Sequence, residues 1–111
     1  MRVIITKRSS TKAERLFAEI LKKNHIPFIH RAKIEGKEID FLIGNIAVEI
    51  DGHNQSSERN HWLHSKGFDP IHYQNNALYN DIFSVEESII NKYGLYIRSN
   101  NGKWTQYRKS I

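Results

Sequence analysis

Apolar and polar residues follow two different periods along this 111-residue chain. From Thr11, whose side chain can cap a helix N-terminus, to Asn24, large apolar residues recur every three or four positions, which predicts an α-helix. Pro27 disfavours helical backbone at the residue before it, so the helix should end near Asn24. The first five or six residues predict either a short strand or a loose arm.

The middle of the chain has the pattern of a β-meander. Three runs of large apolar residues follow the helix. The turns between them, Glu35-Gly36-Lys37 and Gly44-Asn45, are short enough for antiparallel hairpins. The predicted strands cover residues 28–33, 39–43 and 46–50.

The second half of the chain returns to helical spacing. Residues 57–66 predict a helix that ends before Gly67, and residues 71–73 predict a short strand on the other side of the sheet. A further helix is expected over residues 79–92. The Asn-Gly pair at 101 and 102 then predicts a hairpin over residues 95–107.

Composition agrees with one α/β domain over residues 1–111, with a mixed central sheet flanked by helices. Hydrophobic residues make up 39% of the chain and charged residues 26%, which is ordinary for a globular protein. The absence of cysteine excludes disulfides and thiolate metal sites. No apolar run approaches the roughly 20 residues of a bilayer-spanning helix, and the N-terminus is too short for a signal peptide. We therefore expect a soluble, cytoplasmic protein without a membrane partner.

Charge is distributed unevenly around a net value of +5. Lys and Arg outnumber Asp and Glu by ten to three in residues 1–37, and by five to none in residues 92–111. Residues 38–91 hold nine acidic residues against two basic ones. Basic flanks suit phosphates and an acidic centre suits a cation, although solvated surface charge also clusters by chance.

Three carboxylates stand in or beside the middle strands. Glu49 and Asp51 are two residues apart, so they share one face of a strand, and a hairpin would place Asp40 across from the Glu49 end. Carboxylates about 4 Å apart repel by roughly 4 kcal/mol per pair at an effective dielectric near 20, so convergence calls for a cation or for protonation. Oxygen ligands favour Mg²⁺ or Mn²⁺. In the alternative interpretation, Asp40 and Asp51 are ordinary strand-end or turn acids.

These carboxylates belong to a longer set of residues with a family resemblance. The chain from Thr11 to Ile90 resembles the very-short-patch-repair-endonuclease-like branch of the PD-(D/E)XK nuclease superfamily, in particular its small bacterial and phage domains. The matching residues are Glu14, Ile39-Asp40-Phe41, Val48-Glu49-Ile50-Asp51-Gly52, His53, Arg59, Leu63, Gly67, Tyr73-Gln74-Asn75 and Asn80.

The resemblance implies a restriction-endonuclease-like fold and a DNA endonuclease that hydrolyses phosphodiester bonds with Mg²⁺ or Mn²⁺. It implies Asp40 and Glu49 as the principal metal ligands, with Glu14 supporting the metal or its water. We expect Asp51 to assist through the metal or its water. Asp51 stands where the superfamily usually has lysine, which leaves the activator of the water open. His53 follows the strand that carries Glu49 and Asp51, and is a candidate general base or acid, or a contact for the scissile phosphate.

Two of the candidate residues have a purely structural alternative. Glu14 stands three residues after Thr11, the spacing of a capping box in which the glutamate only binds the helix N-terminus. Arg59 is a candidate to hold a phosphate or to orient an active-site carboxylate, or else to pair with Glu58 or Asp69.

The expected partner is DNA, in a bacterial or phage-infected cell. His61 and His64 are interpreted as surface or DNA-facing residues, and His25, His30 and His72 receive no role. A homodimer or a larger nuclease assembly would suit the cutting of both strands. The rival hypotheses are a catalytically inactive DNA-binding or regulatory module on a nuclease scaffold, and cleavage selective for branched or mismatched DNA. The candidate DNA-binding residues are Lys12, Arg15, Arg31, Arg59 and Lys66.

Overall fold

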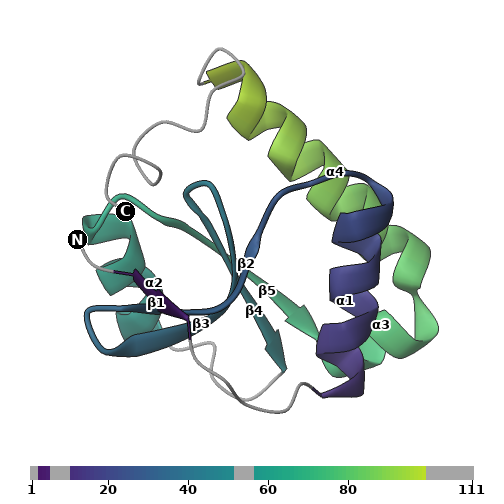
Figure 1. Cartoon of the computed structure of the whole chain (residues 1–111), viewed down its shortest axis with the longest axis horizontal. Coiled ribbons are helices and arrows are strands. Elements are labelled where there is room, and N and C mark those ends of the chain that lie inside the picture. The colour runs from purple at the N-terminus through teal and green to yellow at the C-terminus, as the bar shows by residue number, and fades with distance from the viewer. Residues whose placement is uncertain (1–2, 6–10, 52–56, 100–111) are drawn as a thin grey trace.

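The structure is a computed structural model that describes residues 3–5, 11–51 and 57–99, with the backbone alone at residues 3–5 and 51. Five strands in these ranges form one mixed sheet in the order β1-β2-β3-β4-β5, and helices pack against it (Figure 1). No helix in the described ranges is long and apolar enough to cross a membrane. The elements are β1 (Val3–Ile5), α1 (Lys12–Lys23), β2 (Ile29–Ile34), β3 (Lys37–Ile43), β4 (Ile46–Asp51), α2 (Ser57–Ser65), β5 (Asp69–Gln74), α3 (Asn75–Asn80) and α4 (Ile82–Ser99).

The sheet combines the predicted meander with one parallel strand. β1 to β4 pair antiparallel in sequence order, which confirms the hairpins expected between β2, β3 and β4. β5 pairs parallel with β4, from Ile46 opposite Asp69 to Asp51 opposite Gln74. Because parallel neighbours need a long connection, the chain returns through α2 before β5 begins. The α/β fold with a mixed sheet and flanking helices is therefore confirmed.

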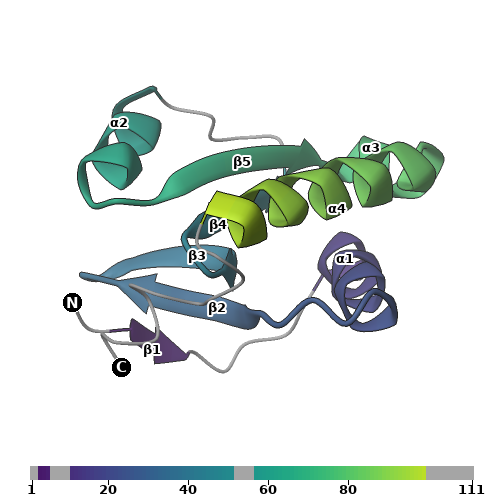
Figure 2. The same cartoon turned by 90° about the horizontal axis from the view of Figure 1, so that it is seen from above.

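The sheet separates two hydrophobic cores. Figure 2 shows α2 on one side of the sheet and α1, α3 and α4 on the other. In β4, Ile46, Val48 and Ile50 belong to the core under α1, α3 and α4, whereas Ala47 belongs to the core under α2. Alternation along the strand therefore turns Glu49 toward α2.

The first helix follows its sequence signals closely. The Thr11 hydroxyl accepts a hydrogen bond from the Glu14 amide at 3.2 Å, and Asn24 is the C-cap. His25 then takes a left-handed backbone conformation, φ +56°, and the Ile26 amide donates to the Leu21 carbonyl at 2.9 Å. This is the usual way in which a helix satisfies its last carbonyls, so His25 has a structural role.

The C-terminal part of the described chain differs from expectation. The helix expected over residues 79–92 is two helices, α3 and α4, and α4 continues to Ser99. The hairpin expected to begin at residue 95 is therefore wrong for residues 95–99, and its turn lies outside the described residues. The helix continues because Tyr96 is buried against Gly44, where an added Cβ would lie 2.4 Å from the tyrosine ring.

Candidate active site

At the end of the β3–β4 hairpin where the predicted carboxylates lie, hydrogen bonds between side chains and the backbone replace backbone pairing. The backbone register runs from Ile43 opposite Ile46 to Phe41 opposite Val48. One step further, the Asp40 carboxylate accepts a hydrogen bond from the Ile50 amide at 2.6 Å. The Glu49 carboxylate in turn accepts a hydrogen bond from the Asp40 backbone amide. Side chains therefore connect the two strands here, and the two carboxylates converge as the hairpin predicted.

Arg59 of α2 holds the Glu49 carboxylate from the other side. Its Nε and Nη2 atoms each lie 2.6 Å from Glu49 Oε1, and Nη2 also donates to the Glu38 carbonyl at 2.5 Å. Of the alternatives for Arg59, the structure shows contact with the candidate carboxylate. Asp69 pairs instead with Lys92.

Burial makes Glu49 a perturbed acid. Its side chain is 12% exposed, and burial raises the pKa of Glu49 from 4.5 to about 7. The Arg59 charge opposes this rise, and the Asp40 charge adds to it. Any further cation at this carboxylate would favour its ionised form. A perturbed pKa with identifiable charged neighbours is typical of functional sites.

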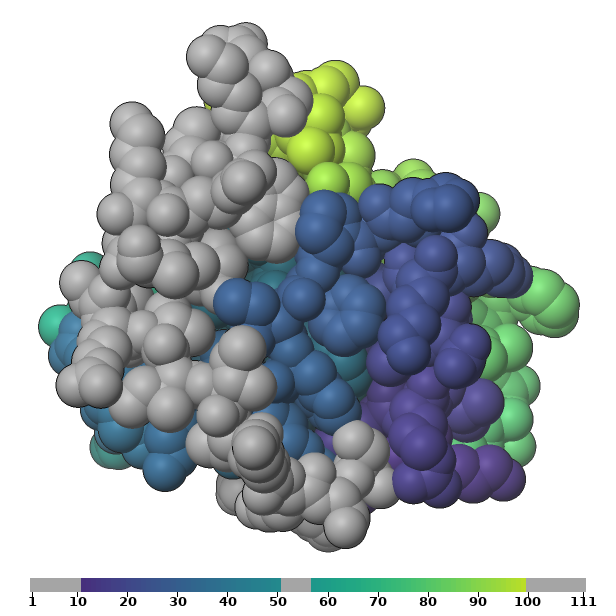
Figure 3. Space-filling model, in the orientation of Figure 1, coloured from purple at the N-terminus to yellow at the C-terminus, as the bar shows by residue number. Residues whose placement is uncertain are grey.

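Glu14 points into the protein rather than back along its own helix. Its Oε1 atom lies 2.5 Å from Arg31 Nη2 and 3.2 Å from His30 Nε2. One bond of the predicted capping box is present, because the Glu14 amide donates to the Thr11 hydroxyl. The second bond is not made, because the Glu14 carboxylate binds His30 of β2. Glu14 therefore ties α1 to β2, and Figure 3 shows the surfaces of these two elements side by side.

Arg31 does not fit the predicted role of a DNA contact. Its side chain is 3% exposed, and besides Glu14 it binds Glu38 of β3 through Nη1 at 3.2 Å. A cation paired with two carboxylates and enclosed by the protein is not presented to a phosphate.

Arg31 also marks a change of face within β2 that the sequence did not reveal. Its φ of +58° is uncommon for a non-glycine residue. His30 before it stacks on Phe41 on the α1 side, with ring centroids 4.5 Å apart, whereas Ala32 after it belongs to the core under α2. Residues two apart in a regular strand would share a face. Strained backbone of this kind concentrates at functional sites.

Two histidines without a predicted role lie at this end of the molecule. His30 contacts Glu14, as described above, and His72 of β5 lies opposite Glu49 in the parallel register. His72 Nε2 is 2.8 Å from Oδ1 of Asn60, which follows Arg59 in α2. The only signal for His72 would have been the pairing of β5 with β4, which hydrophobic periodicity alone does not provide.

The remaining candidates are distributed as follows. The Asp51 side chain and His53 lie outside the described residues, although the Asp51 backbone ends β4 opposite Gln74. Lys12 and Arg15 are exposed on α1, and Lys12 Nζ lies 5.5 Å from the centre of the Tyr79 ring. Lys66 pairs with Glu35 at 3.2 Å. Their roles in catalysis and DNA binding stay predictions.

The described part of the site offers a metal ion an incomplete set of ligands. Among the residues that the structure describes, no group of three or more His, Cys, Asp or Glu side chains is arranged to hold a metal. Asp40 and Glu49 nevertheless provide two carboxylates, the hard oxygen donors that Mg²⁺ and Mn²⁺ prefer. They fit as part of a metal site that Asp51 or water would complete.

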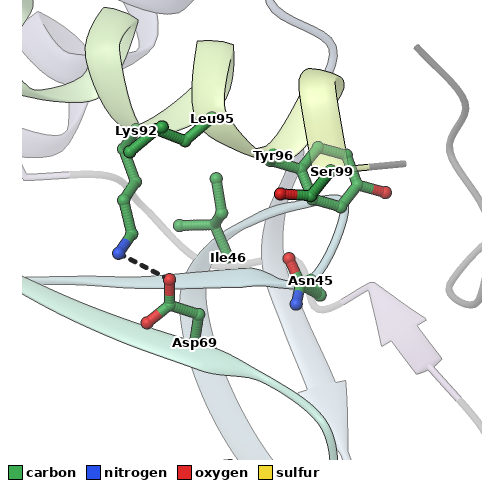
Figure 4. Close-up of a pocket in the computed structure, with 7 residues that line it drawn as sticks. All are labelled: Asn45, Ile46, Asp69, Lys92, Leu95, Tyr96 and Ser99. Atoms are coloured by element: carbon green, nitrogen blue, oxygen red, sulfur yellow. Dashed lines mark ion pairs between the residues drawn. The ribbon is translucent and has the colours of Figure 1, made fainter. Parts of the chain in front are cut away.

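A cavity of about 160 Å³ lies at the opposite end of the parallel strands (Figure 4). Lys92 and Asp69 form an ion pair of 2.6 Å across it. Ligands of α/β sheets gather at the carboxyl ends of parallel strands, where Glu49 and His72 lie, rather than at the ends where the strands begin. The cavity is lined by Asn45, Ile46, Asp69, Lys92, Leu95, Tyr96 and Ser99.

Comparison with known proteins supports a nuclease fold. No protein-family model matches the chain, and no curated protein sequence matches it. Among solved structures, the catalytic domain of the homing endonuclease I-Bth0305I is similar, with a TM-score of 0.69 and 28% sequence identity. The match covers 79% of this chain and 99% of that domain. The chain therefore shares the fold of that endonuclease catalytic domain. Its candidate active end is the one at which Asp40, Glu49 and Arg59 meet.

Proposed function

We propose that this protein is a metal-dependent DNA endonuclease of the PD-(D/E)XK type. The observation that carries the proposal is the convergence of Asp40 and Glu49 at the end of a hairpin where side chains connect the strands. The fold of an endonuclease catalytic domain supports DNA as the substrate. Exposed basic residues on α1, Lys12 and Arg15, are candidates for contacts with the DNA backbone.

Asp40 and Glu49 would hold the divalent cation, and Asp51 would assist. When bound, such a cation supplies Lewis-acid polarisation of the phosphodiester and a water of lowered pKa. The Ile50 amide fixes the Asp40 carboxylate, and the Asp40 amide holds that of Glu49. Both ligands are thus oriented by groups on rigid elements before the cation arrives, which reduces the cost of assembling the site.

The test is a cleavage assay on supercoiled plasmid and on branched DNA, with Mg²⁺, Mn²⁺ or EDTA. Asp40→Asn and Glu49→Gln should each lower the cleavage rate at least about a hundredfold, because each removes a charged metal ligand. Asp69→Asn is the matched control, since it makes the same chemical change at the opposite end of β5 and should leave cleavage unchanged. Equal rates for Asp40→Asn and the wild type would refute the proposal.

A second candidate is a catalytically inactive DNA-binding module on the same scaffold. The observation that favours it is the pairing of Glu49 to an arginine, which neutralises the carboxylate without a metal ion. Such a module would bind DNA equally well in EDTA and would cleave none of the substrates.

A further inference from the structure

The contacts between Arg59 and Glu49 leave Arg59 able to bind a second group. Two of its nitrogen atoms share Oε1 of Glu49, and Nη2 also binds the Glu38 carbonyl of β3. The Arg59 side chain is 26% exposed to solvent, whereas that of Arg31 is 3% exposed. Arg59 therefore places a positive charge on the carboxylate that the proposed function assigns to the metal ion.

We propose that Arg59 is an exchangeable counter-ion, which neutralises Glu49 until a divalent cation displaces it and which then binds a DNA phosphate. This inference rests on the proposed function, because it takes Glu49 as a metal ligand. Two Arg59 nitrogens already contact Glu49 Oε1, which has two lone pairs, and a guanidinium and a divalent cation repel each other, so the cation competes with Arg59 for this oxygen. The planar array of guanidinium donors suits phosphate oxygens as well as a carboxylate.

Arg59 can move from Glu49 to a phosphate without losing all of its contacts. The Glu38 carbonyl is a neutral acceptor, so Arg59 can keep this contact while its remaining donors turn away from Glu49. Arg59 lies in the nine-residue helix α2, which Leu63 anchors in the core under that side of the sheet. The Arg59 side chain can therefore rotate away from Glu49 while α2 stays in place. Metal binding and DNA binding would consequently strengthen each other, since one frees the group that the other uses.

Calorimetric titration of the full chain with Mn²⁺, without DNA, tests the competition directly. Arg59→Gln removes the competing charge and should bind Mn²⁺ about tenfold more tightly than the wild type. Arg59→Lys keeps the charge but cannot place two nitrogens on the same carboxylate oxygen. Its affinity for Mn²⁺ should therefore lie between those of the wild type and Arg59→Gln. Lys92→Gln is the matched control, because it also removes one cation from an ion pair, at the far end of β5. Its affinity should stay within about twofold of the wild type.

The second measurement follows binding of a short DNA duplex with and without Ca²⁺. Ca²⁺ should strengthen DNA binding by the wild type and by Lys92→Gln, and should do so much less for Arg59→Gln. The inference is overturned if both Arg59→Gln and Arg59→Lys bind Mn²⁺ no more tightly than the wild type does. Arg59 would then only position Glu49. In that case metal-dependent cleavage by the wild type would still support the proposed function. If the wild type and all variants neither bind Mn²⁺ nor cleave DNA, the inference and the proposed function fail together.

Discussion

The two ends of the β3–β4 hairpin are built from different kinds of contact. At the turn end, the backbone ladder is continuous to Ile43 and Ile46, and the Tyr96 ring covers Gly44. At the other end, carboxylates bind backbone amides of the opposite strand, and arginines from β2 and α2 bind carboxylates. Shape and apolar burial stabilise the turn end. Charge interactions stabilise the end with Asp40 and Glu49, called here the open end.

This difference separates stability from chemistry. Apolar packing at the turn end is non-directional and depends little on pH, so it holds the hairpin closed while the charged groups at the other end titrate. Charged groups at the open end are costly to bury unless each has a partner, and they leave ionisable oxygen atoms next to one another. The open end can therefore respond to pH, salt and cations, to which the contact between Tyr96 and Gly44 should be indifferent. The following four predictions test that contrast.

Arg31→Met should have the largest effect on stability. It should lower the free energy of unfolding by about 3–5 kcal/mol, because it leaves the buried Glu14 carboxylate without its closest cation. Lys23→Met, which breaks the exposed ion pair with Glu86, should cost less than about 1 kcal/mol. Urea denaturation of both variants gives the comparison, and similar losses for the two would contradict the importance of the buried pair.

Gly44→Ala tests the turn end. Its φ of +60° costs an alanine about 1–2 kcal/mol, and the new methyl group would overlap the Tyr96 ring, which adds about 1–3 kcal/mol. Gly36→Ala is the control, because Gly36 has a φ of +84° but nothing within 4 Å of an added Cβ. It should show the backbone cost alone. Thermal unfolding that shifts equally in both variants would show that the Tyr96 contact contributes little.

Glu49 should make the stability of the open end depend on pH. Its pKa is raised from 4.5 to about 7, so the folded protein binds more protons than the unfolded chain within that window. The contribution of Glu49 to stability is therefore fully present below pH 4.5 and is lost as pH rises through 7, by about 3 kcal/mol at most. Denaturation at pH 5, 6, 7 and 8 in EDTA should show Glu49→Gln gaining stability relative to the wild type as pH rises. A constant difference would contradict the shifted pKa.

Asp40→Asn should have the smallest effect on stability. The asparagine oxygen can still accept the Ile50 amide, so only the charge assistance of that bond is lost, about 1 kcal/mol. Asp40→Ala removes the acceptor and should cost about 2 kcal/mol. Denaturation midpoints for the two variants measure this difference. If Asp40→Asn destabilised the protein as much as Asp40→Ala, its cleavage defect could not be assigned to chemistry.

Much of the fold could be predicted from periodicity. The Thr11 cap, the helical spacing after it and the short turns around Gly36 and Gly44 are local signals, and they correctly predicted α1 and the strands β2 to β4. The same hairpin geometry predicted that Asp40 would lie near Glu49. Local signals succeeded here because the interactions concerned connect residues close together in the sequence.

The remaining features depend on contacts between distant elements. The left-handed backbone at Arg31 accompanies its pairing with Glu14 and Glu38, which come from two other elements. The place of His72 opposite Glu49 depends on the parallel register of β5. Likewise, α4 continues past the position where a hairpin was expected, because Tyr96 packs against Gly44 from the other half of the chain. No local pattern contains this information.

The contact between Tyr96 and Gly44 has a consequence for synthesis of the chain on the ribosome. A hairpin can form within about 1–10 µs, whereas translation at about 5–20 residues per second needs several seconds for the roughly fifty residues between Gly44 and Tyr96. During those seconds the face of the turn that later contacts the Tyr96 ring is exposed. A nascent chain that stalled before α4 would therefore display this apolar surface, which is a natural target for chaperones.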